Sequence, residues 1–333
     1  MTCGNERNDP IRSSGVDWLG LLLLVPPPLF WAGNFLIGRL VRGTVPPMSL
    51  LFWRWVIALV LLLPFAWKPM RRDLPRYWQY RWRILSVSLA GVVAFNSFVY
   101  IGLRSTTASN ALLLNSLIPI LIVLLSAIFY RQRLYAVQIT GLLLSFAGVL
   151  VIISHGEIAR IVSLSLSHGD LIVFGAMIAW AFYTLWLRGF PPDIDRIGLM
   201  AVQIVVGLIV LIPLYQWERM SGAVPIWNGT SFAALAYLGI FPSVAAYLLY
   251  NIGVARVGAA RAGLSVHLIP VFGVILAVIF LNEHIHAYHA LGIAIIAAGI
   301  FCAMRSGNAP HSKSGNGKNN GALRSGNVKP GRG

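Results

Sequence analysis

The stretch "IGLRSTTASNALLLNSLIPI" at Ile101–Ile120 has a counterpart at Ile252–Val271, which reads "IGVARVGAARAGLSVHLIPV". The two stretches align without a gap at an offset of 151 residues. The correspondence extends in both directions, with an offset of 149 in the earlier part, and it pairs Gly20 with Gly169, Trp31 with Trp180, Arg39 with Arg188, Pro64 with Pro213, Pro119 with Pro270, Phe129 with Phe280, Gly141 with Gly292 and Gly148 with Gly299. We therefore expect two homologous halves.

The composition predicts a polytopic membrane protein, because 57% of the 333 residues are hydrophobic and only 11% are charged. Soluble domains carry about 25% charged residues. The net charge of +16 is concentrated in one loop and the C-terminal tail, which favours contact with anionic lipid over nucleic acid. The two cysteines, Cys3 and Cys302, exclude a disulfide framework. The first apolar run is too long for a signal peptide and is interpreted as a retained helix.

Ten apolar runs have the length of about 20 residues that spans a bilayer. They are Trp18–Gly38, Val45–Trp67, Ile84–Leu103, Thr106–Tyr130, Leu134–Ser154, Leu171–Leu187, Ile197–Trp217, Ser231–Ala255, Ala262–Asn282 and Ala287–Met304. Each half therefore holds five spans. Because five is odd, the second half must run through the membrane in the opposite direction to the first. Inverted repeats of this kind support alternating access in transporters.

The basic residues set the orientation. If the N-terminus is cytoplasmic, most of the 26 Lys and Arg fall on the inner side, and "KPMRRDLPRYWQYRWR" at Lys68–Arg83 is the richest segment. We expect both termini in the cytoplasm of a bacterial cell, with the chain in its inner membrane. The predicted parts are a cytoplasmic N-terminus (1–17), a first five-helix repeat (18–154), an outer connecting loop (155–168), an inverted second repeat (169–304) and a disordered cytoplasmic tail (305–333).

Three segments carry a resemblance to a known family: "FWAGNFLIGRLV" from Phe30, "PPMSLLFWRW" from Pro46 and "LIPVFGVILAVIFLNEHIHAYHALGIAIIAAGI" from Leu268. Over nearly all of Trp18–Met304 the sequence resembles the EamA-type branch of the drug/metabolite transporter superfamily. The resemblance implies an exporter of amino acids or other small metabolites, and one group of the family exports aromatic amino acids. The family's glutamate after helix nine matches Glu283, whereas the equivalent position of the first repeat is Gln132.

The first span contains three consecutive prolines, Pro26–Pro28, which should bend or break its helix. Broken backbone at membrane depth is tolerated where it lines a cavity or is buried in protein. Pro27, Trp31, Asn34 and Gly38 share one helical face, so we interpret this helix as cavity-lining; a kink that serves only packing is the alternative. Pro119 and Pro270 are predicted to bend the fourth and ninth spans in the same way.

Polar and aromatic side chains within the spans are candidates for substrate binding, because polar groups are costly in a bilayer. The candidates are Trp31, Asn34, Asn96, Tyr100, Asn115, Trp180, Tyr183, Tyr247, Tyr250, Asn251 and His267. Hydrogen bonding between helices explains any single one of them equally well. Arg54, the one charge within a span, is expected to extend to the outer interface and to serve structure.

Two further patterns have simpler explanations than a ligand site. The histidines of "NEHIHAYH", which begins at Asn282, suggest a metal, but a solvated turn is favoured and no metal or cofactor is predicted. The paired glycines of the fifth and tenth spans indicate close helix packing, either between the repeats or in a homodimer.

The predicted spans lack the acidic residue that carriers of organic cations usually keep, and they lack a well-placed cation for phosphates. The remaining Trp, Tyr, Asn and His suit a neutral amino acid, with aromatic ones the first choice.

We expect one repeat to rock against the other around a central site. His267 leaves proton antiport open beside facilitated diffusion or exchange, and antiport of another metabolite or drug is the alternative function. A polytopic enzyme or a sensor fits less well, because no acid–base cluster is evident and a sensor needs no inverted repeats.

Overall fold

In the computed structural model, which describes residues 17–41, 43–132, 135–157, 159, 167–281 and 284–305, all regular structure is helical. Ten segments are long and apolar enough to cross a membrane, and they lie within a few residues of those predicted. They are Trp18–Gly38, Pro47–Arg72, Arg81–Gly102, Asn110–Tyr130, Ala136–Ile153, His168–Leu187, Arg196–Met220, Gly229–Val257, Ala259–Phe280 and Ala287–Met304. The predicted all-α membrane fold is confirmed. The N-terminus (1–16), most of the connecting loop, the tail (306–333) and Glu283 lie outside the described residues.

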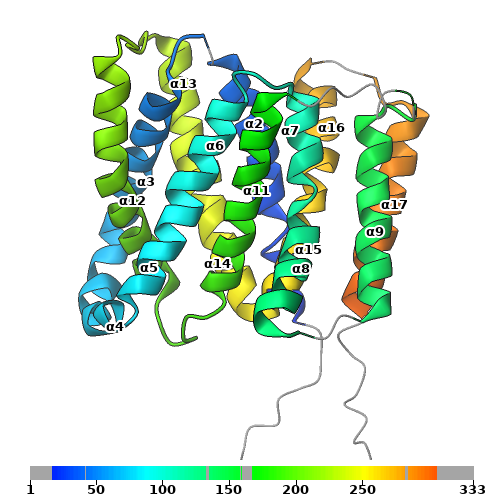
Figure 1. The fold of residues 1–333 in the computed structure, drawn as a ribbon, viewed down its shortest axis with the longest axis horizontal. Coiled ribbons are helices and arrows are strands. Elements are labelled where there is room, and N and C mark those ends of the chain that lie inside the picture. Colours follow the sequence, from blue (N-terminus) through cyan, green and yellow to red (C-terminus); the bar gives the residue numbers. More distant parts are fainter. Residues whose placement is uncertain are drawn as a thin grey trace, which may run out of the picture.

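The spans divide into shorter helices, whose bounds are α1 Trp18–Leu22, α2 Pro26–Leu40, α3 Pro47–Arg72, α4 Leu74–Gln79, α5 Arg81–Val87, α6 Phe95–Gly102, α7 Ala108–Asn115, α8 Ile118–Tyr130, α9 Ala136–Ile153, α11 His168–Leu187, α12 Arg196–Met220, α13 Gly229–Leu238, α14 Ala246–Val257, α15 Ala259–Leu264, α16 Leu268–Leu281 and α17 Ala287–Arg305. Neighbouring spans run in opposite directions, so that α1 begins and α17 ends at the same end of the bundle, below in Figure 1. We call this the terminal end. The short helix α4 also lies there.

Prolines interrupt the spans where the sequence predicts. α1 ends at Leu22, and α2 starts with Pro26, because a proline is tolerated in the first turn of a helix, where its missing N–H needs no partner. Pro119 is the second residue of α8, which follows a break after α7. In the ninth span a 3₁₀ turn at Ser265–His267 separates α15 from α16, in which Pro270 is the third residue. Each of these helix ends thus lies within a few residues of a proline.

Two π-helical segments, which the sequence analysis did not predict, interrupt the third and eighth spans. They are Ser88–Ala94, between α5 and α6, and Gly239–Ala245, between α13 and α14. The second segment lies 151 residues after the first at both of its ends, so the two are equivalent in the repeat. A π-helical turn frees backbone groups from the regular ladder, and such turns are frequent at functional sites.

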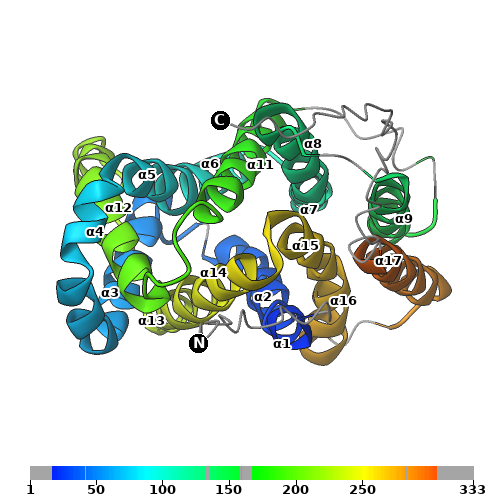
Figure 2. The same ribbon diagram turned by 90° about the horizontal axis from the view of Figure 1, so that it is seen from below.

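Helices of opposite repeats pack against each other throughout the bundle. α3 packs against α12, α6 against α11, and α9 against α17. The α9–α17 pair stands at one end of the long axis of the molecule in Figures 1 and 2. Because these pairs join the second span with the seventh and the fifth with the tenth, the two halves interlock about a pseudo-two-fold axis rather than forming separate bodies.

Buried carboxylates join α3 to α12 at both ends. At the end opposite the termini, Glu218 accepts hydrogen bonds from the backbone N–H groups of Met48 (2.9 Å) and Ser49 (2.7 Å), and so caps the first turn of α3. At the terminal end, Asp73 accepts from the backbone N–H of Asp195 at 3.1 Å. The hydrogen bond from Arg72 holds the pKa of Asp73 below its ordinary value. The ionised carboxylate therefore stabilises the fold at any pH above its pKa in the unfolded chain. This stabilisation is lost as the pH falls from there through the lower pKa of the folded protein.

The paired glycines bring α9 and α17 into backbone contact. A Cβ atom at Gly148 would lie 2.7 Å from the carbonyl oxygen of Gly292 and 2.8 Å from the backbone nitrogen of Ile296. In the other direction, a Cβ at Gly292 would lie 2.9 Å from the carbonyl oxygen of Gly148. The glycines therefore allow close packing between the two repeats, which is one of the two roles expected of them.

We predict that Gly148→Ala lowers the thermal unfolding midpoint of the detergent-purified protein by several degrees, because overpacking of a close contact costs about 1–3 kcal/mol. The measurement is fluorescence-detected size-exclusion chromatography after heating. Gly273→Ala is the matched control, since Gly273 is also helical and a Cβ there meets nothing within 4 Å. Equal midpoints for the two variants would contradict the close contact.

Candidate functional site

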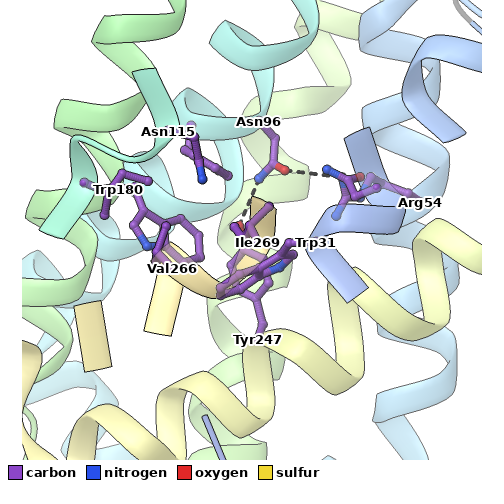
Figure 3. Close-up of a pocket in the computed structure, with 11 residues that line it drawn as sticks. Trp31, Arg54, Asn96, Asn115, Trp180, Tyr247, Val266 and Ile269 are labelled. Atoms are coloured by element: carbon purple, nitrogen blue, oxygen red, sulfur yellow. Dashed lines mark hydrogen bonds between the residues drawn. The ribbon is translucent and has the colours of Figure 1, made fainter. Parts of the chain in front are cut away.

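A narrow cavity lies at the centre of the bundle, where the broken helices and the π-helical segments meet (Figure 3). Its lining comes from both repeats and consists of Trp31, Asn34, Arg54, Phe95, Asn96, Asn115, Ile118, Trp180, Tyr247, Val266 and Ile269. No carboxylate belongs to this lining. The buried acids Glu218 and Asp170 lie instead near the ends of their spans, where they cap helices.

Repeat-equivalent residues touch each other across this cavity. Asn96 Nδ2 donates to the hydroxyl of Tyr247 at 3.0 Å, and these two residues are 151 apart in the chain. The rings of Trp31 and Trp180, 149 residues apart, meet edge to face with centroids 5.0 Å apart. Residues related by a two-fold axis can touch only close to that axis. The cavity therefore lies on the axis that relates the two repeats.

A second pair of equivalent contacts flanks the axis. The hydroxyl of Tyr100 donates to Asn34 Oδ1 at 2.8 Å, and the hydroxyl of Tyr183 donates to Asn251 Oδ1 at 2.6 Å. In the repeat, Asn34 corresponds to Tyr183 and Tyr100 to Asn251, so the tyrosine and the asparagine have exchanged places. The same hydrogen bond is thus made twice, once in each half. The tyrosine donor lies on the third span in the first half and on the sixth span, the equivalent of the first, in the second half.

Aromatic rings form one wall of the cavity. Trp31 packs against Trp180 and, with ring centroids 5.3 Å apart, against Tyr250. Trp180 in turn packs against Tyr183 at 5.0 Å and Tyr247 at 5.3 Å. All five rings are buried, which places a compact aromatic cluster at the interface of the two repeats.

The backbone carbonyls that the π-helical segments free are hydrogen-bonded by side chains of the site. Trp31 Nε1 donates to the carbonyl of Pro242 at 3.3 Å. The carbonyl of Gly91, the repeat equivalent of Pro242, accepts from the Tyr247 hydroxyl at 2.7 Å and from Asn96 Nδ2 at 2.9 Å. Buried backbone groups need such partners where no water reaches them. Asn96 and Tyr247 are therefore held in place by the backbone itself.

The expectation that Arg54 extends to the outer interface is wrong. Its side chain is 1% exposed and points into the centre of the bundle, where it lines the cavity. Nε donates to Ser243 Oγ at 2.8 Å, and Nη1 donates to the Tyr100 hydroxyl at 2.6 Å, to Asn34 Oδ1 at 3.2 Å and to Asn96 Oδ1 at 3.3 Å. These oxygens replace the hydration that an interfacial arginine would obtain from water. The sequence did mark Arg54 as the single charge within an apolar span. It did not show that the side chain points into the bundle instead of toward the membrane surface.

Asn115 differs from the other amides of the site. It lines the cavity opposite Arg54 and is 2% exposed. In the described part of the chain, no hydrogen bond engages its side-chain amide. Asn34 and Asn96 are each held by several partners, whereas the amide of Asn115 remains available to a solute.

The structure brings six of the eleven predicted site residues to the cavity surface and places the others behind it. Trp31, Asn34, Asn96, Asn115, Trp180 and Tyr247 line the cavity. Tyr100 contacts Arg54 and Asn34. Tyr183 and Tyr250 pack against the Trp180 ring, and Asn251 accepts a hydrogen bond from Tyr183. Of the helix-bending prolines, Pro119 and Pro270 follow Ile118 and Ile269, which do line the cavity.

His267 is fully buried and lies away from the cavity. Its Nε2 contacts the carbonyl oxygen of Ser116 at 2.9 Å, and its Nδ1 makes a short contact with the hydroxyl of Ser145 on α9. Ser116 is the repeat equivalent of His267, so this pair also lies on the pseudo-two-fold axis. The imidazole thereby joins the two broken spans to α9.

The histidine-rich turn is built on ring stacking. His286 and Tyr288 stack with centroids 5.4 Å apart, and the backbone N–H of His286 donates to His289 Nδ1 at 3.1 Å. Within the described ranges, no group of three His, Cys, Asp or Glu side chains is arranged to hold a metal ion.

Comparison with known proteins agrees with this architecture. The model of the EamA-like transporter family matches residues 18–154 and, separately, residues 167–305, so that each match covers one repeat. The chain belongs to the EamA-like transporter family. It is accordingly a multi-pass membrane transporter and not an enzyme.

Relatives of this EamA-like transporter cover most of its length. An uncharacterized transporter of Archaeoglobus fulgidus is 32% identical over 283 residues, which are 84% of this chain and 95% of that protein. The uncharacterized transporter YyaM of Bacillus subtilis is 26% identical over 294 residues, 85% of this chain and 92% of its own. A probable terminal-alkyne amino-acid exporter of Streptantibioticus cattleyicolor is 25% identical over 238 residues, 72% of this chain and 75% of its own. A solved crystal structure has the same fold, with a TM-score of 0.71 and 21% identity, and the match covers 88% of this chain and 98% of that one.

The contrast between two asparagines of this EamA-like transporter gives a prediction. Asn96→Ala removes hydrogen bonds to Arg54, Tyr247 and two backbone carbonyls, so we expect the unfolding midpoint to fall, since each buried group left without a partner costs about 1–3 kcal/mol. Asn115→Ala should leave the midpoint unchanged and weaken transport. Thermal unfolding and proteoliposome uptake, measured on both variants, check this. The reverse order of stabilities would contradict the assignment.

Proposed function

We propose that this transporter exports neutral amino acids, preferring aromatic ones, across a bacterial inner membrane. The observation that carries the proposal is a cavity on the repeat axis that combines aromatic rings and amides with no carboxylate. Rings offer apolar and edge-to-face contact to a side chain, while amides bind the polar end of a zwitterion. A cavity without carboxylates disfavours organic cations. The amino-acid class is further supported by the exporter from Streptantibioticus cattleyicolor that is named for amino acids.

The proposed mechanism is rocking of one repeat against the other about the central axis. The contacts that would change are those between equivalent residues, Trp31 with Trp180 and Asn96 with Tyr247, because they join the two halves at the site. The edge-to-face contact between the rings involves no hydrogen bond, but movement of Trp31 would break the hydrogen bond from its Nε1 to the Pro242 carbonyl. This hydrogen bond and the one between Asn96 and Tyr247 must both be exchanged for bonds to the solute or to water. Transporter folds with inverted repeats commonly bind at such a midplane site.

The proposed orientation places the terminal end in the cytoplasm. The basic segment Lys68–Arg83 lies at this end, around α4. Loops rich in Lys and Arg stay on the cytoplasmic side of membranes. The direction of net transport, export, follows from the resemblance to exporters, and a homodimer stays a prediction.

We predict saturable counterflow of labelled phenylalanine into proteoliposomes that hold the full chain and an unlabelled amino-acid mixture. Labelled threonine and a labelled polyamine are followed in parallel, and we expect phenylalanine to compete better than threonine while the polyamine is not taken up. Trp31→Ala should reduce the apparent affinity for phenylalanine about tenfold, the effect of about 1.4 kcal/mol of lost ring contact. Trp78→Ala is the matched control, because this tryptophan is 72% exposed on α4.

Uptake of the polyamine, or of no amino acid at all, would contradict the assignment of the solute while leaving the fold untouched. A pH gradient applied across the same vesicles distinguishes exchange from proton antiport, the alternative mode. Antiport predicts accumulation driven by the gradient alone.

A further inference from the structure

We propose that Arg54 is the binding site for the carboxylate of the transported solute, so that the transporter recognises its substrates by their carboxylate and not by their ammonium group. The inference rests on the proposed function for the identity of the solute, and on the geometry of Arg54 for the group that is recognised.

The first argument is the charge of Arg54. A guanidinium stays protonated in proteins, and a buried ion is costly unless an opposite charge pairs with it. All four partners of Arg54 are neutral oxygens, from Ser243, Asn34, Asn96 and Tyr100. Within the described ranges, no carboxylate forms an ion pair with Arg54. The positive charge at the centre of the bundle is thus solvated by dipoles and has no counter-ion of its own.

The second argument is the set of donors that remain. Nε and Nη1 make all four hydrogen bonds, and no described residue accepts one from Nη2. Three acceptors share the two N–H groups of Nη1, so one of these bonds can be given up. A carboxylate needs two parallel N–H donors on one edge of a guanidinium, and Nη2 with Nη1 supplies such an edge.

The third argument is the position of Arg54 relative to the rest of the lining. Arg54 and the free amide of Asn115 lie on different sides of the cavity, whose lining also includes the Trp31 and Trp180 rings (Figure 3). A carboxylate on Arg54 would place the body of a small solute against these rings. The ammonium group would meet only carbonyl and amide oxygens, because the lining offers it no acid.

The charge is also confined to one repeat. Arg54 corresponds to Gln203 at the offset of 149 residues, and Gln203 is buried with its Nε2 unpaired. A structural requirement shared by the two halves would not need an arginine in one and a neutral amide in the other. The asymmetry is expected of a residue that recognises a solute, which carries its negative charge at one end only.

A cavity nearer the terminal end agrees with an anionic group on the solute. Arg188 and Arg261 line it together with Gln132 and Gln138. Leu264 belongs to this cavity, and Val266, two residues further, belongs to the central one. Clefts lined by one sign of charge raise the local concentration of oppositely charged solutes.

The test uses the full chain in proteoliposomes and competition against counterflow of labelled phenylalanine. 3-Phenylpropanoate keeps the carboxylate and lacks the ammonium, whereas phenethylamine keeps the ammonium and lacks the carboxylate. We expect the propanoate to compete within a fewfold of unlabelled phenylalanine and the amine to compete at least about tenfold more weakly, as the loss of a charge-assisted pair implies. Competition by phenethylamine equal to that by the propanoate would overturn the inference.

Variants locate the effect on Arg54. Arg54→Gln should remove the preference for the propanoate over the amine, while Arg219→Gln, at the end of α12 away from the central cavity, should retain it. If Arg54→Gln keeps the preference, the inference is wrong. Because this variant can fail to fold, the competitor series on the unaltered protein decides the question independently.

Direct binding separates this inference from the proposed function. Addition of 3-phenylpropanoate to the detergent-purified protein should change its tryptophan fluorescence, through Trp31 and Trp180, and phenethylamine should not. Carboxylate binding without any amino-acid counterflow would overturn the proposed function and support the inference. Phenylalanine counterflow that the amine blocks as well as the propanoate would support the function and overturn the inference.

Discussion

The guanidinium of Arg54 holds the centre of this transporter together, because its four oxygen partners come from three other spans. Asn34 lies on the first span, Asn96 and Tyr100 on the third, and Ser243 on the eighth, which belongs to the other repeat. A charge inside a bilayer must be surrounded by polar groups, and those groups must themselves be fixed. Much of the unusual local structure follows from this requirement. The π-helical turn at Gly239–Ala245 carries Ser243, and the matching turn at Ser88–Ala94 frees the carbonyls that position Asn96.

The two repeats share side-chain hydrogen bonds as well as the order of their helices. The hydrogen bond between Tyr100 and Asn34 recurs as the bond between Tyr183 and Asn251 with the residue types exchanged. The departures from symmetry are equally specific. The Pro242 carbonyl accepts a hydrogen bond from Trp31, while the equivalent carbonyl of Gly91 accepts hydrogen bonds from Asn96 and Tyr247. The two halves thus share the tyrosine–asparagine hydrogen bond and differ in the side chains that donate to the freed carbonyls.

Packing between the repeats is strong at one end of the long axis and adaptable at the centre. α9 and α17 touch through backbone at Gly148 and Gly292, which leaves no room for relative sliding. At the axis, by contrast, rings meet edge to face and single hydrogen bonds cross between the halves. The α9–α17 pair is close-packed and therefore resists deformation. The contacts between the repeats at the centre can be exchanged, which suits a rocking motion of one repeat against the other.

The sequence by itself determined the ten spans, the two halves and the breaks in the first, fourth and ninth spans. These follow from apolar length, from an aligned repeat and from prolines such as Pro26 and Pro119, all of which act within a few turns of the chain. Only the tertiary structure decided which polar residues meet. It turned Arg54 inward, placed His267 behind the cavity and created both π-helical turns. The physical reason is that the direction of a side chain within a span depends on how that helix is rotated against neighbours far away in sequence, and local patterns carry no information about that rotation.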